Sequence, residues 1–188
     1  MKIVALSEVD IEAAAKSAAT VLRRGGVILY PTDTLYGLGA DALSDDAVAK
    51  VRRIKRRDEK KPIYAMAESL AALETYAEIS GDARVLARAF WPGSLTLIFS
   101  KKPTVETGIA RGIKTFGARA SNNPFCLALA RAFAKPYTAT SANKSGKKPE
   151  RSLEKILSQL GKGASDIDLV IDAGELPERM PSTVVDTR

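Results

Sequence analysis

The sequence predicts an α/β (α+β) fold, with one domain over residues 1–188 in which helices pack on a mixed β-sheet. Short apolar runs typical of strands alternate along the chain with longer amphipathic segments typical of helices. The length suits a single domain of ordinary size. We find no repeat, low-complexity tract or interdomain linker in the sequence. One compact unit is therefore expected.

The first thirty residues predict a strand, a helix and a second strand. Residues 2–6 (KIVAL) form a short apolar run, and Ser7 with Asp10 makes an S-x-x-D start signal. This signal predicts a helix over residues 8–24, which a Gly-Gly pair ends. The following run, residues 27–30 (VILY), indicates a buried strand.

Residues 31–43 (PTDTLYGLGADAL) interrupt the apolar pattern and are interpreted as a loop whose glycines turn the chain toward the next helix. The G-x-G-x-x-A spacing within it starts seven residues beyond Tyr30, too far for the pyrophosphate turn of a dinucleotide site. Ser44 is placed to cap a helix over residues 45–57, whose acidic start and basic end suit the helix dipole.

The middle of the chain predicts three strands and two helices. The apolar run at 63–67 and the alternating run at 94–99 indicate strands, and 115–120 is a weaker strand candidate. Helices are expected near 69–78 and over 82–90. The FWPGS stretch at 90–94, between the second of these helices and the strand at 94–99, is interpreted as a turn, with Trp91 in the core.

The last third predicts two helices and two late strands. The apolar segment 124–134 indicates a helix, and residues 136–150 a strand end that runs into a loop. A helix over Leu153–Leu160 and strands at 168–172 and 182–186 complete the pattern.

The composition excludes several kinds of active site. There is no histidine, which removes a Ser-His-Asp triad, a Cys-His pair and any histidine-ligated zinc site. The one cysteine, Cys126, lies in an apolar pattern and is expected in the core. The net charge of +7 favours an anionic partner such as a nucleotide, phosphate or RNA. No apolar run is long enough for a membrane span and no secretory signal is visible, so a cytoplasmic protein is expected.

Two polar segments stand where chemistry could occur. KRRDEKKP (55–62) follows a predicted helix and could hold a polyphosphate through Lys and Arg, although such charge runs are usually a solvated face. TATSANKSGKKP (138–149) offers hydroxyls, an amide and backbone N–H groups to an anion, although it also fits a plain turn. No P-loop motif occurs.

Six motifs in fixed order resemble one family: PTDTLYGLGADA, KRRDEKKP, WPGSLTLIF, ARASNNP, TSANKSG and PSTVVD. The chain is similar, over about residues 8–188, to the YrdC-like family of threonylcarbamoyl-AMP synthases. This resemblance implies a twisted mixed sheet flanked by helices around a large, basic, concave cavity. It also implies a nucleotidyltransferase reaction in which L-threonine, bicarbonate and ATP give threonylcarbamoyl-AMP and pyrophosphate, for tRNA modification.

The resemblance assigns roles to particular residues. It implies a catalytic tetrad that holds ATP phosphates and the activated carbamate, formed by Lys55, Arg57, Ser141 and Asn143. It implies a threonine site at Thr32, Lys61, Arg119 and Ser182, and nucleotide contacts at Lys55, Arg57, Thr115 and Ser141. Both Lys55 and Arg57 are expected to be partly exposed in the cavity, so that their loss would abolish turnover with little effect on stability.

The implied chemistry needs no histidine, because the protein mainly positions anions and neutralises developing charge. ATP is expected as a substrate that carries its own Mg²⁺, since the sequence shows no protein metal cage. Expected partners are threonine, bicarbonate, ATP, a threonylcarbamoyl-transferase complex that accepts the product, and tRNA or double-stranded RNA.

Two other functions fit parts of the sequence. An RNA-binding paralogue would keep the basic surface without synthase activity, but it has no need of the complete tetrad. Carbamoyl transfer, as in related domains of hydrogenase maturation proteins, normally belongs to much larger chains. The motifs also depart from the family pattern in several places. Ser121 and Asn123 stand for proline and histidine, Lys61 stands where the family often has asparagine or histidine, and a serine often found near Pro149 is missing.

Overall fold

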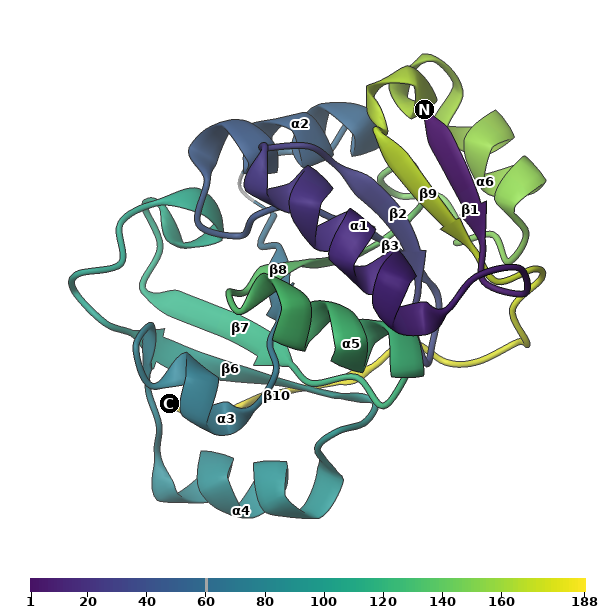
Figure 1. The fold of residues 1–188 in the computed structure, drawn as a ribbon. Coiled ribbons are helices and arrows are strands. Elements are labelled where there is room, and N and C mark those ends of the chain that lie inside the picture. Colours follow the sequence, from purple (N-terminus) through teal and green to yellow (C-terminus); the bar gives the residue numbers. More distant parts are fainter. Residues whose placement is uncertain (60) are drawn as a thin grey trace.

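A computed structural model of the chain describes residues 1–59 and 61–188. Within them the strands form one mixed sheet in the order β1-β9-β2-β3-β8-β4-β7-β6-β10, and β5 pairs with β6 off this path (Figure 1). The strands are β1 (Lys2–Ala5), β2 (Ile28–Pro31), β3 (Tyr36–Gly39), β4 (Tyr64–Met66), β5 (Ala77–Glu78), β6 (Leu95–Lys101), β7 (Thr115–Arg119), β8 (Tyr137–Ser141), β9 (Leu169–Asp172) and β10 (Thr183–Asp186). The predicted mixed α/β fold is confirmed.

Helices cover both faces of this sheet (Figure 1). One face packs on α1 and α5, through a cluster rich in alanine and aromatic side chains. The opposite face packs on the remaining helices around a second cluster. The helices are α1 (Ile11–Arg23), α2 (Asp45–Lys55), α3 (Leu70–Leu73), α4 (Gly81–Phe90), α5 (Pro124–Phe133) and α6 (Leu153–Leu160), with 3-10 turns η1 (Gly108–Ala110) and η2 (Gly161–Asp166). No helix in the described part of the chain is long and apolar enough to cross a membrane.

Side-chain caps mark the starts of α1 to α5, and one of them corrects the sequence prediction. Ser44 caps α2 as predicted, accepting the N–H of Ala47 at 3.3 Å. The start signal assigned to Ser7 is wrong, because Asp10 is the N-cap of α1 and accepts the N–H of Ala13 at 2.9 Å. The first helix therefore begins at Ile11.

The glycine segment after β2 is a strand, and its interpretation as a loop is wrong. Gly37 and Gly39 belong to β3, which pairs antiparallel with β2. A Cβ at either glycine would come within 3.1 Å of the Tyr30 ring. Glycine suits both positions because the Tyr30 ring, and at Gly39 also the Ile28 side chain, comes close to the β3 backbone, and no turn toward Ser44 is involved.

The helix predicted near 69–78 is shorter than expected. The structure has only α3 (Leu70–Leu73), after which β5 pairs with the end of β6. Trp91, predicted in the core, is only half-buried and packs against the edge of the core. Its indole N–H donates to the Leu95 carbonyl at 2.7 Å. Cys126 is buried as predicted.

Candidate functional site

A cavity of about 270 Å³ opens on the sheet face that carries α1 and α5. On β4 the alternate residues Tyr64 and Met66 reach it, since neighbouring residues of a strand point to opposite faces. Its walls come from the β2–β3 connection, from β4, β6, β7 and β8, and from the segment before β10. The lining residues are Tyr30, Thr32, Thr34, Leu35, Tyr36, Gly37, Arg57, Pro62, Ile63, Tyr64, Met66, Thr96, Arg119, Ala139, Thr140, Ser141, Pro149, Pro181, Ser182 and Val184.

The charged residues of this lining are Arg57 and Arg119, and none of the described lining residues is acidic. The volume lies just below the roughly 300–1,000 Å³ of typical ligand pockets. A small anionic molecule suits its interior, and a nucleotide would have to extend across its open side.

Three members of the predicted tetrad meet directly at the end of α2. The Lys55 Nζ donates to the backbone carbonyls of Ser141 and Asn143, the latter at 2.8 Å, and to Asn143 Oδ1 at 3.0 Å. The hydroxyl of Ser141 donates to the same Oδ1. Lys55 is only 1% exposed and does not line the cavity, so the expectation of a partly exposed lysine is wrong. Its ammonium holds the β8 loop in place.

Arg57 reaches the cavity because the chain turns sharply after α2. Arg56 adopts a left-handed conformation at φ 48°, which ends the helix at Lys55, two residues before the predicted end. Arg57 is half-buried, its Nη2 donates to the Pro62 carbonyl at 2.9 Å, and its buried Nε has no partner. Burial lowers its pKa, and Arg52 adds to the effect. This is the partial exposure that the sequence predicted for Arg57.

The side chain of Asn143 organises the loop that follows β8. Its Nδ2 donates to the carbonyls of Lys144 and Lys147, while its Oδ1 accepts from Lys55 and Ser141. An amide supplies both donors and acceptors, which neither a carboxylate nor an ammonium could do here. The loop backbone is thereby held beside the cavity wall formed by Ser141.

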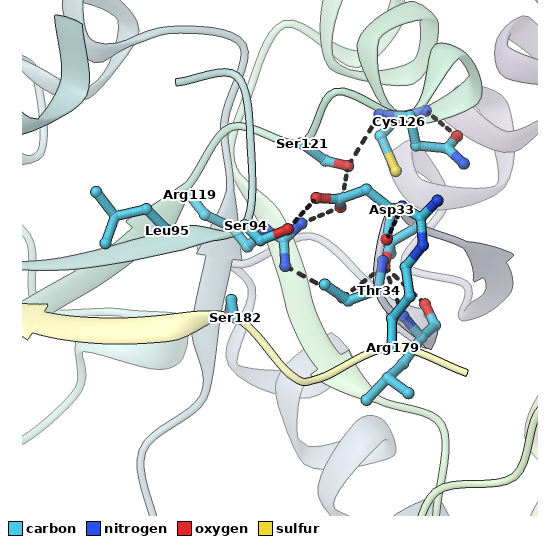
Figure 2. A network of polar contacts seen from close by, with 12 residues as sticks. Asp33, Thr34, Ser94, Leu95, Arg119, Ser121, Cys126, Arg179 and Ser182 are labelled. Atoms are coloured by element: carbon cyan, nitrogen blue, oxygen red, sulfur yellow. Dashed lines mark hydrogen bonds and ion pairs between the residues drawn. The ribbon is translucent and has the colours of Figure 1, made fainter. Parts of the chain in front are cut away.

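A buried carboxylate that the sequence analysis did not single out lies next to Arg119, one of the residues of the predicted threonine-binding site (Figure 2). Asp33 forms an ion pair with Arg119, and both side chains are almost fully buried. Asp33 also accepts from the hydroxyls of Ser121 at 2.5 Å and Ser94 at 3.0 Å. The signal was present in the sequence, since Asp33 lies between the two threonines of PTDT and Ser121 follows Arg119 by two residues.

Thr32 and Ser182 both line the cavity, and both are already hydrogen-bonded within the protein. The Thr32 Oγ1 accepts the N–H groups of Thr34 and Leu35 at 3.1 Å and donates to the Leu35 carbonyl at 2.7 Å. Ser182 shares a 2.9 Å hydrogen bond with Thr96. Both hydroxyls are therefore held in fixed positions on the wall.

We call residues 173–182 the strap, because they connect β9 to β10 (yellow in Figure 1) and add Pro181 and Ser182 to the cavity. The strap is tied down at its start by Tyr36, whose hydroxyl donates to Gly174 O at 2.8 Å and accepts the Ala173 N–H at 2.8 Å. Burial raises the pKa of Tyr36 to about 12, so the hydroxyl keeps its proton. Arg179 donates to the Asp33 carbonyl at 2.9 Å near the other end.

Four predicted site residues are absent from the cavity lining: Lys55 and Asn143 lie directly behind its wall, and Lys61 and Thr115 form no hydrogen bond with the tetrad in the described part of the chain. Lys61 is exposed in the turn before β4, and Thr115 stands at the start of β7, four residues from Arg119. The structure thus brings Arg57, Ser141, Thr32, Arg119 and Ser182 to one cavity, with Lys55 and Asn143 directly behind its wall.

Lys55 makes stability depend on pH in a defined direction. Burial, with Arg57 as a smaller cause, lowers its pKa to about 7, whereas an unfolded chain keeps a lysine near 10.4. Between these values the unfolded state binds more protons, so this group makes stability rise with pH, and below pH 7 it adds no slope. In urea unfolding at about pH 7 and about pH 9, the wild type should gain stability relative to Lys55→Met. If the difference in unfolding free energy between the wild type and Lys55→Met is the same at both pH values, this prediction is wrong.

Tyr64 forms part of the cavity wall and leaves no room for a side chain at Gly117. A Cβ at Gly117 would lie 2.3 Å from Cδ1 of Tyr64. Gly117→Ala is therefore expected to push the ring toward the cavity and to cost about 1–3 kcal/mol, measured by thermal unfolding. Adding Tyr64→Ala should remove the clash and make the glycine change harmless. Gly81→Ala, with nothing within 4 Å, is the control and should leave the melting temperature unchanged.

Comparison with known proteins places this chain in a family. The Sua5/YciO/YrdC family model, described as Telomere recombination, matches residues 20–188. The chain belongs to this family. A threonylcarbamoyl-AMP synthase of Pyrococcus abyssi is 37% identical over 171 residues, which are 90% of this chain and 49% of the relative. The chain thus spans about half the length of that synthase. A curated protein of Methanocaldococcus jannaschii is 33% identical over 98% of this chain and 86% of its own length.

Solved structures of the Sua5/YciO/YrdC family share the fold. Pyrococcus abyssi Sua5 complexed with L-threonine superposes with a TM-score of 0.87 at 35% identity, over 99% of this chain and 54% of Sua5. Escherichia coli YciO gives a TM-score of 0.81 at 31% identity, over 94% of this chain and 84% of YciO. The twisted mixed sheet that the resemblance implied is therefore a feature of the family.

Proposed function

We propose that this chain is a threonylcarbamoyl-AMP synthase, a nucleotidyltransferase that converts L-threonine, bicarbonate and ATP into threonylcarbamoyl-AMP and pyrophosphate. One observation carries the proposal: two arginines, each with a buried Nε that lacks a partner, line one cavity that contains no acidic side chain among its described residues. Named relatives support it, since a protein 37% identical is a threonylcarbamoyl-AMP synthase and Sua5 has been solved with L-threonine.

The threonine substrate would occupy the inner part of the cavity. Arg119 would bind its carboxylate, because a guanidinium matches the planar geometry of a carboxylate. Thr32 and Ser182 would contact the rest of the amino acid from their fixed positions on the wall. This leaves the amine free to react with bicarbonate or CO₂ and form a carbamate.

The ATP phosphates would lie at the other arginine. Arg57 and the backbone held by Lys55, Ser141 and Asn143 would neutralise charge as the carbamate oxygen attacks the α-phosphorus and pyrophosphate leaves. Mg²⁺ would come bound to ATP, since no group of three or more potential metal-ligating side chains occurs in residues 1–59 or 61–188. We assign no role to Lys61 or Thr115.

Four further expectations from the sequence stay predictions. They are a single domain over residues 1–188, a cytoplasmic location, contact with tRNA or double-stranded RNA, and transfer of the product to a threonylcarbamoyl-transferase complex.

The test is to incubate the purified protein with ATP, L-threonine and bicarbonate and to measure pyrophosphate release. Release should require threonine and bicarbonate, and it should be lost in Arg57→Ala while the melting temperature stays within a few degrees. A protein that binds RNA but releases no pyrophosphate would instead favour the RNA-binding alternative. Release that does not depend on threonine would also sink the proposal.

A further inference from the structure

We propose that Asp33 is a positioning residue that fixes the guanidinium of Arg119 for the carboxylate of the bound amino acid. The inference depends on the proposed function only for the identity of that ligand. Its evidence is the geometry around Asp33, shown in Figure 2.

The carboxylate of Asp33 is held from several directions and does not reach the ligand cavity. Arg119 Nη2 and the Ser121 hydroxyl donate to Oδ1, and the Ser94 hydroxyl donates to Oδ2 at 3.0 Å. Its backbone is held as well, because Arg179 of the strap donates to its carbonyl oxygen. Asp33 is absent from the lining of the 270 Å³ cavity and contributes instead to a neighbouring hollow of about 290 Å³, so it would act on a ligand in the first cavity only through another residue.

Arg119 is the residue through which it would act. Nη2 is held by Asp33, Nη1 lies 3.3 Å from Thr34 Oγ1, and Nε is buried with no partner. A long arginine side chain loses rotamer entropy when it is fixed, and a guanidinium that is already fixed binds with less of that cost. An unpaired buried N–H is unfavourable, and it leaves the guanidinium with an unused donor beside the cavity that Arg119 lines.

The two arginines of the cavity are held in different ways, and this sharpens the inference. Arg119 is paired with a carboxylate, so the pair has no net charge and acts as a directed hydrogen-bond donor. Arg57 donates instead to the Pro62 carbonyl and keeps its full charge toward the cavity. A neutral pair suits a zwitterionic amino acid, whereas an unneutralised cation suits a polyphosphate. Loss of Asp33 should therefore affect threonine and spare ATP.

The experiment compares KM for L-threonine and KM for ATP in Asp33→Asn. The amide can still offer one oxygen to Arg119 and Ser121, but it carries no negative charge, so the ion pair that fixes Arg119 becomes an ordinary hydrogen bond. KM for threonine should rise about tenfold or more, as for loss of one charge-assisted contact, while KM for ATP stays within about twofold. Ser94→Ala is the matched control, because it removes one donor from Asp33 and leaves the ion pair intact. It should change KM for threonine by less than about threefold.

A double-mutant cycle separates positioning from a general loss of structure. In the Arg119→Ala background, Asp33→Asn should have no further effect on KM for threonine, because the residue through which it acts is gone. The inference is overturned if Asp33→Asn raises KM for threonine and KM for ATP equally. It is also overturned if Asp33→Asn raises KM for threonine as much in Arg119→Ala as in the wild type. If Asp33→Asn does not fold, Asp33→Glu takes its place, because it keeps the charge but moves the carboxylate. Its KM for threonine should again rise while its KM for ATP stays nearly unchanged.

Direct titration with L-threonine by calorimetry keeps this test apart from that of the proposed function. Threonine binding that weakens in Asp33→Asn supports the positioning role even if the wild type releases no pyrophosphate. Pyrophosphate release with an unaltered threonine affinity in Asp33→Asn overturns the role of Asp33 and leaves the proposed function standing. A wild type that does not bind threonine overturns both.

Discussion

Lys55→Ala is expected to lower the free energy of unfolding by about 3 kcal/mol, in addition to abolishing turnover. The substitution removes a fully buried four-carbon stem and leaves two backbone carbonyls and the Asn143 amide oxygen without their shared donor. For a domain of this size the melting temperature should fall by about 6–12 °C. Thermal unfolding followed by circular dichroism measures this directly.

The matched control lies on the same helix. Arg53 is exposed and pairs with Asp166 at the surface, so Arg53→Ala should change stability by no more than about 1 kcal/mol. A melting temperature of Lys55→Ala equal to that of Arg53→Ala would show that Lys55 is not part of the structural framework, and would return it to the role of a cavity residue.

Gly108→Ala is expected to destabilise the fold by about 3 kcal/mol or more. Gly108 has φ +60°, and a Cβ there would lie 2.0 Å from the Ala42 carbonyl oxygen, which is backbone and cannot rotate away. Gly108 also donates its N–H to Asp45 at the start of α2, so the clash would disturb the helix that carries Lys55. Urea unfolding, with the denaturant slope held constant between variants, measures the loss.

Gly112 provides the comparison for this substitution. It has a similar φ of +69° but nothing within 4 Å of an added Cβ. Gly112→Ala should therefore cost only the conformational part, about 1–2 kcal/mol. If the two substitutions cost the same, then the contact with Ala42 is relieved by a small backbone shift and the argument from close approach fails.

The alternation of strands and helices could be predicted from sequence because each element carries a local pattern. Ser44 as a cap and the apolar runs of β2, β4 and α5 depend on neighbouring residues only. The second strand of the β2–β3 hairpin was missed for the same reason. Its glycines suggest a turn locally, and only the Tyr30 ring from the neighbouring strand explains them as strand residues.

The candidate site was predicted less evenly. The family motifs indicated Arg57, Arg119, Thr32, Ser141 and Ser182, all of which line one cavity. Exposure could not be predicted, because the burial of Lys55 depends on a loop more than eighty residues away in the chain. Asp33 was missed although it lies inside the PTDT motif, because its partners Ser94, Ser121 and Arg119 lie 61 to 88 residues further along the sequence and only the fold brings them to it.

The order of strands in the sheet has a consequence for the timing of folding during synthesis. The first strand, β1, pairs only with β9 along the sheet path, and the cavity wall at β6 is completed by β10 and the strap. Residues near 170 and near 184 must therefore leave the ribosome before β1 can pair with β9 and β6 with β10. At synthesis rates of about 5–20 residues per second, the nascent chain spends roughly ten seconds or more with an unpaired first strand. Over that interval it has a hydrophobic, incomplete sheet that a chaperone could recognise and no finished site for a ligand to stabilise.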